Sequence, residues 1–215
     1  MANRSQSETR QRRSPDRYEF RVWSHDLSTL FTRLREAGDE SEPEESSEVY
    51  VVSRYQSVFN PKVRDGRLDV KELLGTHKRL ELWHPHLKAQ FPIRLQTEQQ
   101  SVCRILSLSQ PRDWDTIDTA ESFLRDIVEP CPHLVLVPVR KIRTRFNLGS
   151  CSAEFVAVVA GKLERETVCV ESEDANAALR VVARLGLGGR ENCNYQRALR
   201  AMFGIDGMTR ADFQA

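Results

Sequence analysis

The sequence lacks the features that mark several large classes of protein. Its 215 residues carry 32 Lys and Arg against 31 Asp and Glu, a formal net charge of +1, so bulk charge indicates neither a nucleic-acid nor a membrane partner. No uninterrupted apolar run approaches the roughly 18 residues of a membrane span, and the polar start of the chain has no apolar signal segment. We therefore expect a globular protein that is neither secreted by a standard signal nor membrane-spanning.

Cysteine motifs and catalytic motifs are also missing. The five cysteines are widely spread and include no C-x-x-C pair, which argues against a zinc site or a disulfide framework and fits a reducing cytoplasm. No Gly-rich phosphate loop occurs, because the glycines near residue 186 follow a predicted helix rather than a strand. No Ser-His-Asp or Cys-His arrangement is evident. Any electrostatic function must therefore come from local clustering of charge.

Apolar periodicity predicts one domain over residues 17–203, between a disordered basic tail (1–16) and a C-terminal tail (204–215). Asp65-Gly66 is a strong hairpin signal. The acidic segment 39–48 is interpreted as a solvent-exposed loop, and "HPH" (84–86) is interpreted as a turn. The expected strands cover 17–23, 49–55, 61–64, 67–75, 79–83, 133–149, 152–163 and 165–172. The expected helices cover 24–38, 94–109, 115–128, 174–185 and 194–204.

Charged residues recur at alternate positions of several of these strands. In "KIRTRF" (141–146) every second residue is a cation, so one face of the strand is charged and the other is mostly apolar. A single such strand in an open sheet points its polar face to water, whereas five or six favour a barrel with a charged lumen. We therefore predict an α+β fold, an antiparallel barrel of about eight strands flanked by helices. The charged sets are Glu19/Arg21, Lys62/Arg64, Asp69/Lys71, Lys141/Arg143/Arg145, Glu154 and Glu171.

This order of elements resembles the CYTH superfamily, the triphosphate tunnel metalloenzymes, which includes thiamine triphosphatases, tripolyphosphatases and class IV adenylate cyclases. The resemblance rests on a first strand similar to E-x-E-x-K, a helix, basic hairpin strands, a long basic strand and a late acidic strand before a helix. It implies a tunnel of eight antiparallel strands that binds a triphosphate together with Mg²⁺ or Mn²⁺. It covers nearly the whole expected domain.

Carried over by position, the resemblance implies catalytic and metal-binding roles for Glu19, Glu154 and Glu171. It implies phosphate binding by Arg21, Lys62, Arg64, Lys71, Lys141, Arg143 and Arg145. The sequence departs from the family pattern at three positions. Arg21 and Trp23 stand where the first strand of the family has its second glutamate and its lysine, and Cys169 occupies the first position of the late E-x-E pair. The site has thereby lost negative charge and gained a cation.

Three functions remain open at this point. One is a metal-dependent phosphohydrolase that acts on a triphosphate or polyphosphate, with a water attacking phosphorus in line. Another is a tunnel that binds a polyphosphate or nucleotide without turnover, motivated by the two replaced carboxylates. A third, an RNA- or protein-binding module that uses the basic rows externally, is less favoured because few aromatics are available for base stacking. The oligomeric state, monomer or dimer, stays open.

Overall fold

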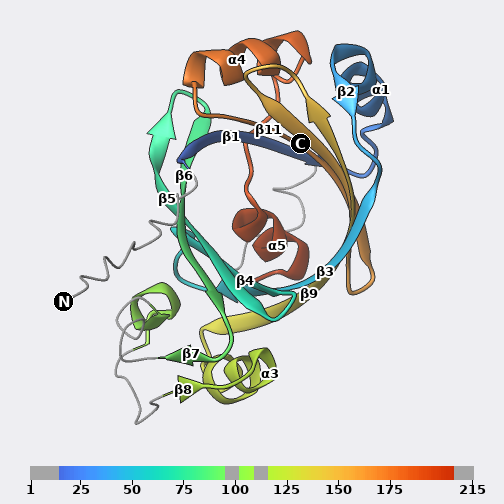
Figure 1. Cartoon of the computed structure of the whole chain (residues 1–215). Coiled ribbons are helices and arrows are strands. Elements are labelled where there is room, and N and C mark those ends of the chain that lie inside the picture. Colours follow the sequence, from blue (N-terminus) through green and yellow to red (C-terminus); the bar gives the residue numbers. More distant parts are fainter. Residues whose placement is uncertain (1–14, 95–101, 109–115, 206–215) are drawn as a thin grey trace, which may run out of the picture.

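Eight antiparallel strands close into a barrel in the computed structural model, which describes residues 15–94, 102–108 and 116–205. Around the barrel the strands follow the order β10-β11-β1-β6-β5-β4-β3-β9, and β9 pairs back onto β10. Figure 1 shows this ring of strands viewed down the barrel. The predicted fold class is thus confirmed. The barrel strands are β1 (Arg17–Ser24), β3 (Glu44–Ser53), β4 (Phe59–Arg64), β5 (Arg67–His77), β6 (Leu80–Gln90), β9 (Leu134–Asn147), β10 (Ser152–Ala160) and β11 (Leu163–Ser172).

The hairpin between β4 and β5 turns at the predicted dipeptide. Asp65 and Gly66 both have positive φ angles, 50° and 65°, as the two central residues of a type I′ turn require. This turn sets the register in which Lys62 lies opposite Asp69 and Val63 lies opposite Leu68. The charged residues of both strands consequently face one side of the barrel wall.

Two sequence interpretations are wrong. The expected loop 39–48 contains β2 (Asp39–Glu40) and the first half of β3, because its acidic residues pair as strand backbone along β9. The expected turn at 84–86 lies inside β6, which continues to Gln90. Pro85 is tolerated there because the register between β5 and β6 shifts next to it, so the strand passes the proline with a bulge.

One side of the barrel is covered by α1 (Ser28–Ala37) and α4 (Ala175–Arg184). Their apolar faces pack on outward-facing residues of β1 and β11, such as Phe20 and Val170. Gly38 ends α1 in an extended conformation, and a Cβ atom at this position would lie 2.1 Å from the carbonyl oxygen of Asn147. Glycine is therefore required by the close approach of α1 to β9.

The opposite side is covered by a short helix over 102–106 and by α3 (Ala120–Ser122), which continues into the π-helical turns of η1 (Phe123–Val128). They bury a second outer core against β3, β4 and β5, as expected for helices from this part of the chain. A two-stranded sheet of β7 (Ile93–Arg94) and β8 (Thr116–Ile117) lies beside them. The predicted tails lie largely outside the described residues. Of the predicted helix 94–109, residues 102–106 are helical, Arg94 belongs to β7, and residues 95–101 and 109 lie outside the described residues.

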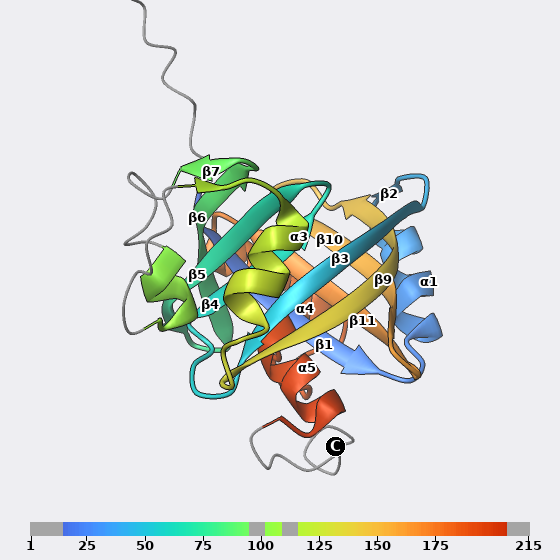
Figure 2. The same cartoon turned by 90° about the horizontal axis from the view of Figure 1, so that it is seen from below.

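The last helix, α5 (Tyr195–Phe203), fills one end of the barrel rather than covering its outside (Figures 1 and 2). Asn194 caps its start by accepting a hydrogen bond from the Arg197 amide at 3.1 Å. Its apolar face packs on inward-facing Val, Ala and Tyr residues of β3, β9 and β10. The lumen is therefore apolar at this end and polar at the other.

Candidate functional site

All ten predicted site residues line one cavity inside the barrel. The cavity has a volume of about 400 Å³ and lies next to the start of α5, at Asn194 and Tyr195. Eight cationic and four carboxylate side chains contribute to its wall, so the lining carries an excess of four positive charges. The cations are Arg17, Arg21, Lys62, Arg64, Lys71, Lys141, Arg143 and Arg145. The carboxylates are Glu19, Asp69, Glu154 and Glu171.

Strand parity explains why these residues meet. On β1, Glu19 and Arg21 face the lumen, whereas Phe20 between them and Val22 after them are buried in the outer core under α1 and α4. The basic rows thus face the lumen and not the outer surface, which removes the basis for an external RNA- or protein-binding surface built from them. At this end of the barrel, β1 places these ionisable groups inward because its apolar residues pack outside, beneath the helices.

The deepest charge cluster is centred on Glu48, a residue that the sequence interpretation left in a loop. Its carboxylate accepts hydrogen bonds from Lys62 at 3.1 Å, from Arg64 at 3.1 Å and from Lys141 at 2.7 Å. Burial would raise the pKa of Glu48, but Lys141 and Lys62 hold it at about 2. The alternation Glu48, Tyr50, Val52 on β3 was the signal that could have placed this residue in the lumen.

Lys141 lies between Glu48 and two tyrosine rings. Its ammonium also donates to the hydroxyl of Tyr50 at 2.6 Å and lies 4.0 Å from the ring centroid of Tyr195 at the start of α5. Burial and the nearby Lys62 lower its pKa to about 7, although Glu48 acts in the opposite direction. This lysine therefore titrates near neutral pH.

A second cluster joins β1, β5 and β11. The Lys71 ammonium donates to the carboxylate of Glu19 and lies 3.9 Å from Glu171. Arg17 approaches Glu171 from the mouth of the barrel, at 3.7 Å. Burial and the neighbouring Glu19 raise the pKa of Glu171. Two carboxylates and one ammonium thus share a small, largely buried space.

Glu154 belongs to a different cluster. Its carboxylate accepts a hydrogen bond from Arg21 at 2.6 Å and lies 3.7 Å from Arg143. Burial would raise the pKa of Glu154, but Arg21 and then Arg143 hold it at about 2. The cation that replaces the family's glutamate on β1 thereby engages one of the three predicted metal ligands.

The rim of the cavity carries the end of the basic row on β9. Glu44 of β3 accepts from Arg143 and lies 3.0 Å from both Arg143 and Arg145. The buried Nε of Arg143 has no hydrogen-bond partner within the described part of the chain. Buried donors are nearly always satisfied in folded proteins, so this group is suited to an acceptor atom of a ligand.

The floor of the cavity contains residues that were not among the predicted site residues. Trp83 donates to Glu81 at 3.1 Å, and Asn194 donates to the same carboxylate at 3.0 Å. Burial raises the pKa of Glu81. Glu81 and Trp83 lie on the predicted strand 79–83, within β6, and Asn194 caps α5; only the packing of α5 into the barrel brings them together.

The side chains that could hold a divalent cation lie at the β1–β11 wall. Glu19, Cys169 and Glu171 each offer a ligand atom, and these atoms lie within 4.8 Å of one another. The predicted ligand Glu154 is instead held by Arg21 and Arg143. Burial raises the pKa of the Cys169 thiol well above its ordinary value, while Arg21 acts in the opposite direction. The retained glutamates, with this thiol, form the donor set.

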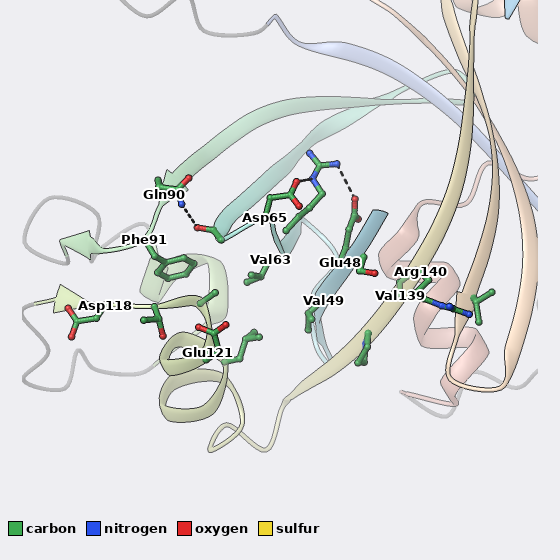
Figure 3. Close-up of a pocket in the computed structure, with 18 of the residues that line it drawn as sticks. Glu48, Val49, Val63, Asp65, Gln90, Phe91, Asp118, Glu121, Val139 and Arg140 are labelled. Atoms are coloured by element: carbon green, nitrogen blue, oxygen red, sulfur yellow. Dashed lines mark hydrogen bonds and ion pairs between the residues drawn. The ribbon is translucent and has the colours of Figure 1, made fainter. Parts of the chain in front are cut away.

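A larger cavity of about 730 Å³ lies outside the barrel, between α3 and the outer face of β3 and β9 (Figure 3). Its wall includes Val49 on one side and Phe91 on the other. Only Arg64 among the ten predicted site residues reaches it. The charged lumen is therefore the better candidate for the functional site.

Comparisons with known proteins give matches only at the level of structure. No family model matches the chain, and neither does any curated protein. A protein from Pyrococcus horikoshii is 19% identical, with 81% of this chain and 94% of that chain covered and a TM-score of 0.48. A Hippeastrum protein described by its dominant triphosphatase activity is 12% identical, with coverages of 87% and 96% and a TM-score of 0.48. The Mimivirus capping enzyme triphosphatase is 8% identical, with coverages of 80% and 89% and a TM-score of 0.44.

Among the described residues, no helix has the length and apolar character needed to cross a membrane. The architecture itself is an eight-stranded antiparallel barrel, and charged residues from β1, β3, β4, β5, β9, β10 and β11 face its lumen. This is the fold that the resemblance to the CYTH superfamily implies.

Proposed function

We propose that this protein binds a triphosphate or polyphosphate in the barrel lumen and hydrolyses it as a metal-dependent phosphohydrolase. The observation that carries the proposal is the gathering of eight Arg and Lys side chains around one cavity of about 400 Å³. Even with the buried Glu48 counted beside the four lining carboxylates, positive charge is in excess. Phosphate oxygens would relieve this repulsion by accepting charge-assisted hydrogen bonds.

Arg143 and Arg145 are the first cations that an entering phosphate would meet, because they lie on the rim. Both pair with Glu44, whose side chain is 50% exposed. An exposed ion pair contributes little free energy, so ligand oxygens can displace Glu44 at small cost. The unpartnered Nε of Arg143 supplies a further donor.

Hydrolysis needs charge neutralisation and an oriented water more than a covalent nucleophile. Lys71 lies beside Glu19 and Glu171, so a cation and two carboxylates are in reach of the same phosphate. The carboxylates would orient the attacking water and hold the divalent ion. That ion, when bound, supplies Lewis-acid polarisation of the phosphoryl oxygens.

A second candidate, binding without turnover, is favoured by one specific contact. Arg21 engages Glu154 at 2.6 Å, which takes this carboxylate away from a metal or a water. Under this alternative the lumen retains its affinity for polyphosphate and releases no product.

Calorimetric titration with tripolyphosphate tests the binding claim. Replacing both Arg143 and Arg145 by Ala should weaken affinity by about a hundredfold, since each lost charge-assisted bond costs roughly 1.5 kcal/mol or more. Arg140→Ala is the matched control, because Arg140 lies on the same strand but is exposed outside the lumen. Unchanged affinity in the double variant would count against a phosphate-binding lumen.

Assays of phosphate release separate the two candidates. The protein would be incubated with tripolyphosphate, ATP or thiamine triphosphate, each with Mg²⁺ or Mn²⁺. Release that depends on Arg143 supports the hydrolase, whereas binding without release from any of these pairs supports the second candidate.

A further inference from the structure

The two replaced carboxylates face each other across one pair of strands. In the antiparallel register of β1 and β11, Glu19 lies opposite Glu171, and Arg21 lies opposite Cys169. The retained glutamates thus form one cross-strand pair, and the replacements form the next pair on the same inward face. The two carboxylate replacements are therefore one local change in the site rather than two scattered ones.

This change alters the chemistry of the donor set. The ligand atoms of Glu19, Cys169 and Glu171 lie within 4.8 Å of one another, and the Cys169 sulfur is 4.0 Å from Oε1 of Glu171. Mg²⁺ prefers oxygen ligands in octahedral geometry. Zn²⁺ and related ions bind cysteine sulfur together with carboxylate oxygen, usually with four ligands. One sulfur and two carboxylates, with a position left for water or a phosphate oxygen, match the second class.

The charges of the cluster also balance when such an ion is present. Glu19, Glu171 and a Cys169 thiolate carry three negative charges, and a divalent ion with Lys71 supplies three positive ones. Burial raises the pKa of the Cys169 thiol, and the Arg21 guanidinium across the strands acts in the opposite direction. Binding breaks the S–H bond of Cys169 and releases its proton to solvent, with no change in oxidation state. Lys71, whose side chain is 43% exposed, can move aside.

We propose that Glu19, Cys169 and Glu171 form a binding site for a thiophilic divalent metal ion of the zinc class, with Cys169 as the ligand that selects it over Mg²⁺. This proposal deepens and rests on the proposed function, because the site lies in the same lumen. The spacing of the cysteines along the chain argues against a zinc site made of several cysteines. The tertiary structure instead brings two glutamates to a single cysteine.

Cobalt provides a direct readout that needs no triphosphate. The full chain, reduced and freed of metal, would be titrated with Co²⁺ and followed by absorption spectroscopy. We expect a thiolate-to-cobalt charge-transfer band, which Zn²⁺ abolishes by displacement and a large excess of Mg²⁺ does not. Absence of the band, or its loss on adding Mg²⁺, would overturn the proposal.

Three variants assign the band. Cys169→Ser should remove it and weaken Zn²⁺ binding by more than about tenfold, while Cys151→Ser, at a buried cysteine outside the donor set, should keep it. Cys169→Glu should remove the band and gain Mn²⁺ binding, which keeps the test decisive if the serine variant does not fold. A band that survives in both Cys169 variants would contradict the assignment.

The outcomes also separate this proposal from the proposed function. A protein that binds tripolyphosphate through Arg143 but gives no cobalt band refutes the metal site alone. A protein that gives the band but does not bind tripolyphosphate refutes the phosphate-binding lumen alone.

Discussion

Glu48→Gln is the substitution that most directly tests the electrostatics of the lumen. The Glu48 side chain is 1% exposed and is the shared acceptor for Lys62, Arg64 and Lys141. Glutamine keeps the shape of the side chain but removes its charge, which removes the shared counter-ion of three neighbouring basic side chains. A buried ion pair broken on one side is strongly destabilising because the remaining charge stays desolvated.

The size of the effect follows from the pKa of Glu48. Burial opposes ionisation, yet Lys141 and Lys62 hold the pKa at about 2, compared with an ordinary value of 4.5. At 1.36 kcal/mol per pKa unit, the charged form contributes about 3 kcal/mol to the free energy of unfolding at neutral pH. In a domain of this size that corresponds to a fall in Tm of roughly 6 to 12 °C for the glutamine variant.

The pH dependence has a definite sign. Because the pKa is lower in the folded than in the unfolded protein, the contribution is fully present above pH 4.5 and is lost as the pH falls toward 2. Urea unfolding of the wild type and of Glu48→Gln, from pH 7 down to pH 3, should therefore show a difference that shrinks on acidification. Glu45→Gln, at an exposed position of the same strand, is the control. Equal stability at pH 7, or a difference that does not change with pH, would refute the reasoning.

Two further predictions concern Lys141 and the neighbouring ring of Tyr195. The pKa of Lys141 is about 7, so loss of its charge above pH 7 should weaken tripolyphosphate binding by up to about tenfold per pH unit. Binding titrations of the wild type and of Lys141→Arg from pH 6 to 8.5 isolate this effect. Parallel curves for the two proteins would contradict it. The buried Tyr195 hydroxyl has no partner in the described structure, so Tyr195→Phe should leave the free energy of unfolding unchanged or raise it by up to about 1 kcal/mol. Tyr195→Ala should cost about 3 to 5 kcal/mol, since it removes the ring that faces Arg21 and Lys141; urea unfolding of both variants provides the measurement.

Much of the barrel could be predicted because alternation along a strand is a local property. "KIRTRF" and "EFRVW" each specify which residues share a face, and Asp65-Gly66 specifies a tight turn whatever surrounds it. The segment 84–86 could not be interpreted in the same way. His-Pro-His resembles a turn locally, but the pairing of β6 with β5 overrides that preference through a bulge beside Pro85.

The inward orientation of the predicted site residues was predictable to the same extent. The ten residues predicted from the resemblance all line the lumen, because inward parity selects them. Their partners were not predictable, since Glu48 meets Lys141 only through pairings that join residues 93 positions apart. Glu44 and Glu48 lie in a segment whose composition is typical of a surface loop. Only the pairing of β3 with β9 shows that they act as counter-ions.

The eight barrel strands and their side-chain alternation follow from the sequence alone, and they indicate which charged groups share a face of the sheet. Tertiary structure decided that the sheet closes, that α5 blocks one end of the lumen, and which carboxylate each cation meets. The reason is physical: side-chain alternation arises within a few residues, whereas ion pairing depends on the register between strands. That register also places Arg21 opposite Cys169 and Glu19 opposite Glu171, and so decides which metal the site is suited to bind.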